Sequence, residues 1–283
     1  MDTDPRIDDA MALLLALRSP ELKVEAITIV AGNVPVEVGT ENARKLVELT
    51  GSTDVIVATG AAGPLFRKLR TAEFIHGENG LGGVNLPAPT IATERRHAVQ
   101  VIRDVVDANP GEITLVTIGP LTNLALAFRQ HPGLAAKVRE IILVGGTVGA
   151  GLVTPLAEPN IYQDAEAAKI VFEAGVPILM VDLTACAQTS FTREDVSRLR
   201  SSKDPVAGFI AAISEPYIKQ AEQTGSVGAR MYDALGVGIA IDPLVAKTVR
   251  PIHVAIETKG EFSYGSTVTN QSLTTANFEG RGD

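Results

Sequence analysis

The chain has 283 residues, of which 45% are hydrophobic and 20% are charged, and its formal net charge is −8. This length accommodates one large domain or two ordinary ones, and the lack of a Pro/Gly/Ser-rich linker, a low-complexity block or a repeat favours a single domain. The acidic balance argues against nucleic acid or an anionic membrane surface as the main partner, because phosphate binding needs a basic face.

Helix and strand signals alternate along the chain. In chain order we predict a buried apolar helix over 8–18, a strand over 23–30, a helix over 36–51 that ends at Gly51, a strand over 54–60, a helix over 94–111, a strand over 112–120, a helix over 121–131, a strand over 139–146, a helix over 164–175, a strand over 176–184, helices over about 193–223 and 231–241, and a strand over 250–260. Residues 61–92 form a long connection rich in Gly and Pro, which is usually functional or disordered. This alternation predicts an α/β fold with an open, mostly parallel sheet and helices on both faces.

The two ends of the chain stand outside this alternation. Acidic residues follow Met1 directly, with no recognisable strand ahead of Asp2, and the closing residues TTANFEGRGD are typical of a loop. We therefore expect one domain over residues 1–283 that lacks its first strand and its C-terminal end, as a fragment or a chain with a misassigned start would.

The single cysteine, Cys186, excludes a disulfide within the chain. A reducing compartment fits this composition, although an exported protein without disulfides is compatible with it as well. No signal peptide and no apolar segment long enough to span a bilayer is recognisable. We therefore expect a cytoplasmic protein that acts on small molecules.

Polar residues follow the predicted strands, which is where ligands bind in a parallel sheet. A strand ahead of Asp2 would bring the acidic start of the chain to the same edge. The polar segments that follow strands are AGNV with Asn33, FIHGENGLGG with His76, IGPLTN, and TPLAEPN with Glu158 and Asn160.

Four carboxylates stand in the first nine residues, directly before an apolar run: Asp2, Asp4, Asp8 and Asp9. The later pair is explained by the helix dipole and by the preference of Asp for the start of a helix. The earlier pair is not, and Pro5 imposes a turn that folds the two pairs toward each other. Carboxylates around such a turn make a site for a hard cation such as Ca²⁺ or Mg²⁺, with further oxygen ligands from elsewhere. Asp233 is a distant candidate, although taken alone it is better explained as the first acid of a helix.

Six motifs occur in order: DTDPRIDDA, AGNV, HGENGL, GPLTN, TPLAEPN and YDALGVGIAIDP. Together they resemble the inosine-uridine-preferring nucleoside hydrolases, from residue 2 to about residue 243. The combination is specific, whereas no single motif is. The resemblance implies a Rossmann-like nucleoside hydrolase fold, a homodimer or homotetramer, and a Ca²⁺-dependent enzyme that releases the free base and ribose from a nucleoside.

The resemblance also implies roles for individual residues. Calcium would be held by Asp4, Asp9, Asp233 and the backbone carbonyl of Ile118, with Asp2 as a supporting acid. Ribose would be bound by Asp8, Asn33, Glu158 and Asn160. Asp4 would accept a proton from the nucleophilic water, and His76 and Tyr232 would contact the leaving base. Carboxylates around the sugar suit a reaction in which positive charge develops on the ribosyl group.

Three positions depart from the family pattern. Arg6 stands in the metal turn where Gly is usual, and Gly permits backbone conformations that other residues resist. Leu152 falls where an Asn commonly touches the sugar. Tyr232 replaces a His that can protonate a purine, and a phenol with an ordinary pKa of about 10 is a poor acid at neutral pH. Tyr217 could stack on a base, but a half-buried helix residue is the more common interpretation.

Two alternatives stay open on the sequence alone. A haloacid dehalogenase-type phosphatase also uses an Asp-x-Asp pair with Mg²⁺, but Pro5 and Arg6 do not fit its motif, and its later Lys and acidic pair are not evident. A nucleoside- or ribose-binding homologue with weakened catalysis is the other alternative, and the three departures motivate it.

Overall fold

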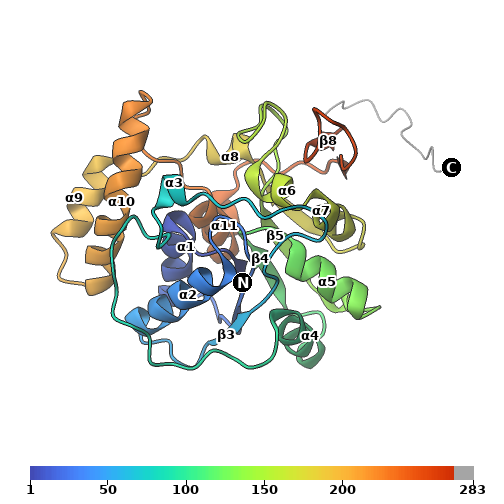
Figure 1. Ribbon diagram of the computed structural model, residues 1–283, viewed down its shortest axis with the longest axis horizontal. Helices are drawn as coiled ribbons and strands as arrows, with labels where there is room; N and C mark the ends of the chain where they lie inside the picture. The colour runs from blue at the N-terminus through green and yellow to red at the C-terminus, as the bar shows by residue number, and fades with distance from the viewer. Residues whose placement is uncertain (271–283) are drawn as a thin grey trace.

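Six parallel strands form the centre of the computed structural model, which describes residues 1–270 (Figure 1). The predicted loop TTANFEGRGD and the C-terminal end lie outside the described residues. The strands are β1 (Asp2–Thr3), β2 (Ala26–Ile29), β3 (Ile56–Thr59), β4 (Thr114–Thr117), β5 (Glu140–Val144) and β6 (Ile178–Val181). Their order in the sheet is β3-β2-β1-β4-β5-β6, and every described pair is parallel. This Rossmann-like order confirms the predicted fold class and places the reversal of strand order between β1 and β4, where ligands bind in such sheets.

The acidic start of the chain is itself the central strand. Asp2 pairs with Thr28 of β2 on one side and with Thr117 of β4 on the other. The sequence does not reveal this strand because two residues carry no periodic pattern. The strand lies at Asp2–Thr3 itself and not ahead of Asp2, which corrects the expectation of a missing first strand, and Asp4 comes directly after it.

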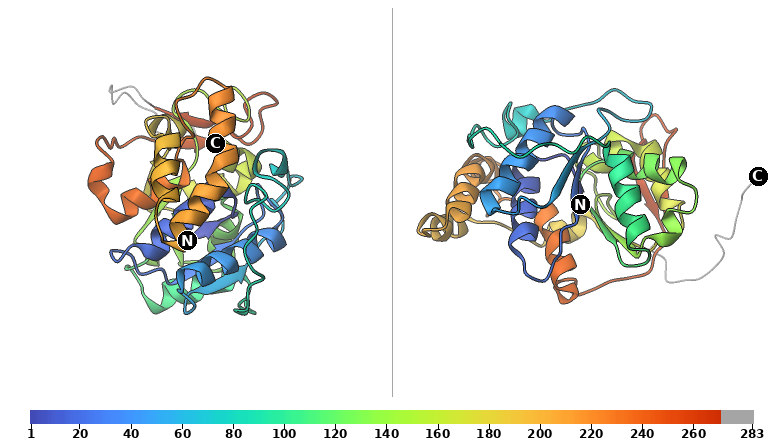
Figure 2. Two further views of the ribbon diagram at one scale, coloured as in Figure 1. Left: turned by 90° about the vertical axis from the view of Figure 1, so that its left-hand side faces the viewer. Right: turned by 90° about the horizontal axis from the view of Figure 1, so that it is seen from below.

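Helices cover both faces of the sheet, and the two groups lie on opposite sides of the strands in Figure 2. One face carries α1 (Ile7–Arg18), α2 (Val36–Thr50) and α11 (Asp233–Ile241), and the other carries α4 (Ala98–Ala108), α5 (Thr122–Gln130) and α7 (Ala165–Phe172). The helix α2 ends as predicted at Gly51, which takes the left-handed conformation at φ 74°. The hairpin of α9 (Arg193–Arg200) and α10 (Pro205–Gln223) packs outside α1.

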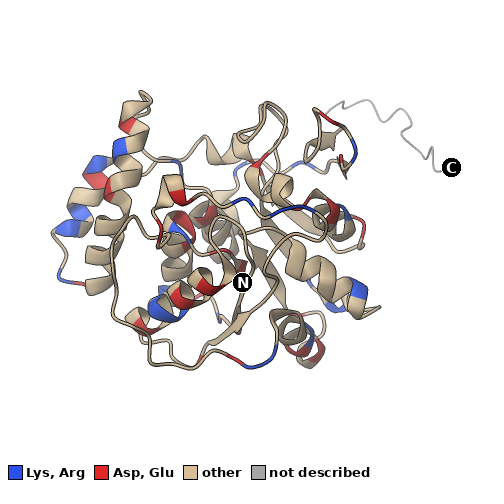
Figure 3. Ribbon diagram, viewed as in Figure 1, with Lys and Arg blue, Asp and Glu red and all other residues tan. Residues whose placement is uncertain are grey.

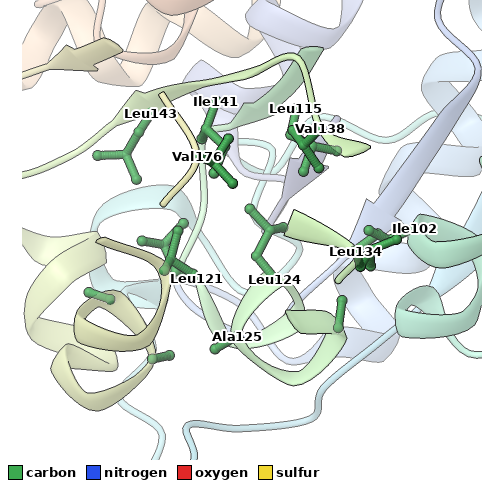
Figure 4. Close-up of a cluster of buried hydrophobic side chains, with 14 of the residues drawn as sticks. Ile102, Leu115, Leu121, Leu124, Ala125, Leu134, Val138, Ile141, Leu143 and Val176 are labelled. Carbon is green, nitrogen blue, oxygen red and sulfur yellow. The ribbon is translucent and has the colours of Figure 1, made fainter. Parts of the chain in front are cut away.

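Alternate residues along a strand pack into the hydrophobic cores on the two faces of the sheet. Leu115 and Ile141 pack toward α4, α5 and α7, in the cluster drawn in Figure 4, whereas Val116 and Ile142 pack toward α11. A strand that is apolar on both faces is typical of a parallel sheet covered by helices on both sides. These cores fix the strand ends that carry the site.

Several short elements were not predicted. They are the helices α3 (Glu73–His76), α6 (Pro159–Gln163) and α8 (Leu183–Cys186), the 3-10 turns Ala135–Lys137 and Pro243–Val245, and β8 (Thr267–Thr269). The strand predicted over 250–260 is β7 (Val254–Ile256), which pairs with β8 in a separate antiparallel ribbon. Elements of three to five residues contain less than two helical turns, so their sequences carry no measurable periodicity.

Charged residues of both signs are interspersed over the outer helices, as Figure 3 shows for α9 and α10. Arg193, for example, bridges Glu215 and Glu222 at 2.9 and 2.8 Å. Such exposed pairs contribute little to stability and mainly keep the surface hydrated. Among residues 1–270, no helix is long and apolar enough to cross a membrane.

Candidate active site

A cavity of about 740 Å³ opens at the carboxyl ends of the strands, above the point where the strand order reverses. Segments far apart in the sequence converge on it, including α3, α6 and α8, which lie on the same side of the sheet in Figure 1. Seven residues predicted for the site line the cavity: Asp4, Asn33, His76, Glu158, Asn160, Tyr232 and Asp233. Asp8, Asp9 and Ile118 do not line it and are completely buried.

The acidic turn closes as predicted around Pro5. Asp9 Oδ1 accepts hydrogen bonds from Thr3 Oγ1 at 2.5 Å and from the Asp4 backbone N–H at 3.3 Å. Arg6 precedes α1 with φ −123° and ψ −162°, an extended conformation that any residue adopts. The backbone at this position therefore accommodates Arg6 without strain.

Three buried carboxylates meet beneath the cavity. Each of Asp8, Asp9 and Asp233 offers an oxygen atom within 4.8 Å of the other two. The helix α11 packs across α1, which brings Asp233 at its start to the first turn of α1. Burial, and then the neighbouring Asp9, raise the pKa of Asp233 well above its ordinary value. The cluster therefore holds like charges that need a positive partner.

Asp4 lies beside this cluster and is fixed by Asn33. Its Oδ2 accepts hydrogen bonds from the backbone N–H and the side-chain amide of Asn33, at 2.5 and 2.7 Å. Its Oδ1 is buried and accepts no hydrogen bond from the described residues. A Cβ at Gly119 would lie 2.8 Å from Asp4 Oδ1, so this close approach explains the Gly of the GPLTN motif. Burial, and then Asp9, raise the pKa of Asp4 well above its ordinary value.

The donor set fits a hard divalent cation. Asp4 Oδ1, Asp9 Oδ2 and both oxygens of Asp233 are buried and accept no hydrogen bond from the described residues. The Ile118 carbonyl accepts one hydrogen bond from Asn160 Nδ2 at 3.0 Å and keeps a second lone pair. Ca²⁺ and Mg²⁺ bind several carboxylate oxygens at once, and buried oxygens that accept no hydrogen bond are available to such an ion. The structure also brings Asp8, predicted as a ribose ligand, within reach of the same position.

Arg6 points into the carboxylate cluster. Its Nη1 contacts Asp8 Oδ1, its Nε lies 3.5 Å from Asp9 Oδ2, and its Nη2 lies 3.8 Å from Asp233 Oδ2. Only 8% of the residue is exposed. Burial alone would lower the pKa of the guanidinium, but the charges of Asp9, Asp233 and Asp4 together raise it, so Arg6 is charged. The sequence identified Arg6 as unusual but did not indicate where its side chain points.

Hydrogen bonds fix the orientations of three polar residues that are predicted to bind ribose. Asn160 Nδ2 donates to the carbonyls of Ile118 and Val144, both at 3.0 Å, and Asn33 Nδ2 donates to Asp4. Glu158 accepts three backbone N–H groups, from Gly146, Asn160 and Ile161, at 2.9 to 3.0 Å. The amide oxygens of Asn33 and Asn160 are thereby oriented to accept hydrogen bonds from a ligand. Glu158 is at once the N-terminal cap of α6 and an acid facing the cavity.

The other end of the cavity is aromatic. His76 is 4% exposed, and burial, then the charge of Arg6, lower its pKa to about 2. The ring of Tyr217 lies 6.2 Å from the His76 ring at an angle of 51°. Tyr217 is half-buried, as predicted, and also lines the cavity. Burial raises the pKa of Tyr232, so its hydroxyl is a hydrogen-bond donor rather than an acid.

The mouth of the cavity contains residues that the sequence motifs do not indicate. Arg70 lies over the ring of Tyr162, with 5.7 Å from its guanidinium carbon to the ring centre, and Arg230 also lines the cavity. Leu152 is 54% exposed and lines the mouth as an apolar side chain. Arg70 belongs to the long connection between β3 and α4, and Arg230 to the segment between α10 and α11, where no periodic pattern indicates which residues face a ligand.

The sequence of the chain matches known proteins along nearly all of its length. The family model described as inosine-uridine preferring nucleoside hydrolase matches residues 1–280. The chain is 39% identical over 279 residues to the pyrimidine-specific ribonucleoside hydrolase RihA of Escherichia coli O8 (strain IAI1), which covers 98% of this chain and 89% of the relative.

Solved structures agree with the sequence match. The plant nucleoside hydrolase PpNRh1 has a TM-score of 0.90 and 36% identity, over 97% of this chain and 87% of that chain. A purine-preferring ribonucleoside hydrolase from Gardnerella vaginalis has a TM-score of 0.91 and 32% identity, over 95% of this chain and 87% of that chain. Sequence and backbone thus confirm the resemblance and set aside the phosphatase alternative. The chain belongs to the inosine-uridine preferring nucleoside hydrolase family and is an N-glycosyl hydrolase of ribonucleosides.

Proposed function

We propose that this protein hydrolyses the N-glycosidic bond of ribonucleosides in a Ca²⁺-dependent reaction that releases the free base and ribose. The observation that carries the proposal is the set of buried carboxylate oxygens without hydrogen-bond donors at the floor of the cavity. Asp4, Asp9, Asp233 and the Ile118 carbonyl would hold the ion. When bound, calcium would lower the pKa of a water molecule and orient the ribose diol.

The residues around the ribose position supply the remaining requirements of the reaction. Asp4 Oδ1 is free to take a proton, because Asn33 holds only the other carboxylate oxygen. Glu158 brings a carboxylate to the cavity wall, and negative charge there stabilises a ribosyl group that becomes positive as the bond to the base breaks. Asp8 would bind ribose hydroxyls, and the oriented amide oxygens of Asn33 and Asn160 would accept hydrogen bonds from them.

The aromatic end of the cavity would bind the base. His76, with its pKa lowered to about 2, is neutral near pH 7 and offers a hydrogen bond rather than a proton. Tyr232 offers a second donor from the start of α11. The relatives include a pyrimidine-specific and a purine-preferring enzyme, so uridine, cytidine, inosine and adenosine all belong in the assay.

We also propose a homodimer or homotetramer and a cytoplasmic location. Exposed apolar side chains near α11 support an association surface: Leu244, Val245 and Val249. Light scattering after size-exclusion chromatography measures the mass, and a monomer at micromolar concentration would contradict the oligomer.

Removal of the metal is the direct test of the calcium proposal. We expect a chelator to lower the release of reducing sugar from ribonucleosides at least about tenfold, because the ion both orients the ribose and activates the water. Added Ca²⁺ should restore the rate. Activity that is indifferent to the chelator would contradict the proposed metal requirement. A nucleoside that binds in calorimetry but is never cleaved at saturating Ca²⁺ would favour the binding-homologue alternative.

Replacement of His76 tests the leaving-group proposal. We expect His76→Ala to lower kcat on ribonucleosides about tenfold, since a hydrogen bond to the departing base contributes about 1 to 1.5 kcal/mol. The loss should be smaller on p-nitrophenyl riboside, whose leaving group departs as a stable anion. Tyr232→Phe keeps the ring and removes only the hydroxyl, so it is the matched comparison. Unchanged kcat and KM for every nucleoside in His76→Ala would remove this residue from the mechanism.

A further inference from the structure

Arg6 contacts the oxygens that a metal ion needs. Its guanidinium faces Asp9 Oδ2 and Asp233 Oδ2, which the proposed function assigns to calcium, and Asp8 Oδ1, assigned to ribose. Two of these carboxylates come from the first turn of α1 and the third from the start of α11. The guanidinium therefore lies where carboxylates from separate elements converge, and it is buried with them.

A guanidinium and a divalent cation compete for these oxygens. Like charges within a few ångströms repel strongly in a buried site, where water does not screen them. The carboxylates need a positive charge beside them, and the Arg6 guanidinium already supplies one. Binding of a metal ion at Asp9 and Asp233 therefore favours a position of the Arg6 side chain outside the cluster.

The cavity offers the Arg6 side chain a position outside the carboxylate cluster. Arg6 lines the same cavity as Glu158, and its charge acts on Glu158, His76 and Tyr217, which form the walls around it. Its backbone is extended and unstrained, so only side-chain rotations are needed.

We propose that Arg6 is a built-in cation that neutralises the carboxylate cluster in the metal-free protein and competes with Ca²⁺ for it. The inference rests on the proposed calcium site. The competition weakens Ca²⁺ binding and stabilises the metal-free fold, and the same contact keeps Asp8 from a ribose until the metal enters. Metal binding and nucleoside binding are thereby coupled through one side chain.

The test measures Ca²⁺ binding by calorimetry and metal-free thermal unfolding in a chelator, with no substrate present. The variants are Arg6→Gly and Arg6→Gln, so that a folding failure of one leaves the other. We expect both to bind Ca²⁺ at least about tenfold more tightly than the unmodified protein, because the competing charge is gone. We expect both to unfold at a lower temperature than the unmodified protein without metal, since the buried carboxylates lose their partner. Saturating Ca²⁺ should remove that difference.

Two controls separate the effect of the Arg6 charge from a general change in the charge of the protein and from a change in side-chain shape. Arg18→Gln removes a charge from the other end of α1, where Arg18 pairs with Asp204 at 2.9 Å on the surface, and should change neither Ca²⁺ affinity nor metal-free stability by a comparable amount. Arg6→Lys retains the positive charge and should retain most of the competition. Equal Ca²⁺ affinity in the unmodified protein, Arg6→Gly and Arg6→Gln would overturn the inference and leave the calcium site intact. Failure of every variant to bind Ca²⁺ would overturn both.

Discussion

Asp233→Asn is expected to abolish nucleoside hydrolysis while raising the stability of the metal-free protein. The loss of kcat/KM should be on the order of 10³, the scale seen when one charge-stabilising group is removed from an active site. Neither oxygen of Asp233 accepts a hydrogen bond from the described residues, so the amide removes a negative charge and little else. Initial rates on ribonucleosides at saturating Ca²⁺ measure the loss.

The stability change has the opposite sign because the carboxylate is a cost to the fold. Burial and the neighbouring Asp9 raise the pKa of Asp233 above its value in the unfolded chain. A carboxyl group whose pKa is raised in the folded state binds its proton more tightly there than in the unfolded chain. At neutral pH this group therefore lowers the free energy of unfolding. Thermal unfolding in a chelator at pH 7 measures this. Asp107→Asn is the control, because Asp107 lies on the surface beside Lys137. A metal-free Asp233→Asn protein that unfolds at a lower temperature would show that the ion pair with Arg6 outweighs the repulsion.

The sheet was predictable because its strands are long enough to show a pattern. The run EIILV is apolar on both faces, and the structure buries Ile141 and Ile142 on opposite sides of the sheet. The strand β1 was missed because Asp2 and Thr3 look like loop residues, and only tertiary pairing with β2 and β4 makes them a strand. The pairing of β7 with β8 was missed for the same reason, since β8 has three residues.

The candidate site was predictable as a set of residues but not as a geometry. Motifs after the strands correctly indicated that Asp4, Asn33, His76, Glu158 and Asn160 lie around one cavity. They could not show that Asn33 binds one oxygen of Asp4 and leaves the other free, because that contact depends on how two separate turns pack together. The direction of the Arg6 side chain could not be predicted either, since a long side chain at a turn can extend to solvent, to substrate or into the protein. Only the packing of α11 against α1 closes a buried cluster that attracts it.

The last expectation concerns Asp8, which the proposed function assigns to ribose rather than to the metal. Asp8→Asn should lower kcat/KM on ribonucleosides about 10- to 100-fold, because a hydrogen bond to a charged carboxylate contributes about 1.5 to 3 kcal/mol. The effect should lie mainly in KM, since the hydroxyls are bound both before and during the reaction. Asp8 is completely buried beneath the cavity, so the change does not alter the surface.

Substrates that lack one hydroxyl show whether Asp8 acts on the sugar. On 2′-deoxy- or 3′-deoxynucleosides the unmodified protein has already lost one of the hydrogen bonds, so Asp8→Asn should cost less there than on the ribonucleoside. Tyr232→Phe is the matched comparison, because it removes a contact to the base and should lower the rate on all of these substrates by a similar factor. If Asp8→Asn also lowers the rate by one factor on every substrate, Asp8 does not contact the sugar and belongs to the metal site. Its oxygen within 4.8 Å of those of Asp9 and Asp233 would then be a ligand atom, and ribose recognition would fall to Asn33, Glu158 and Asn160.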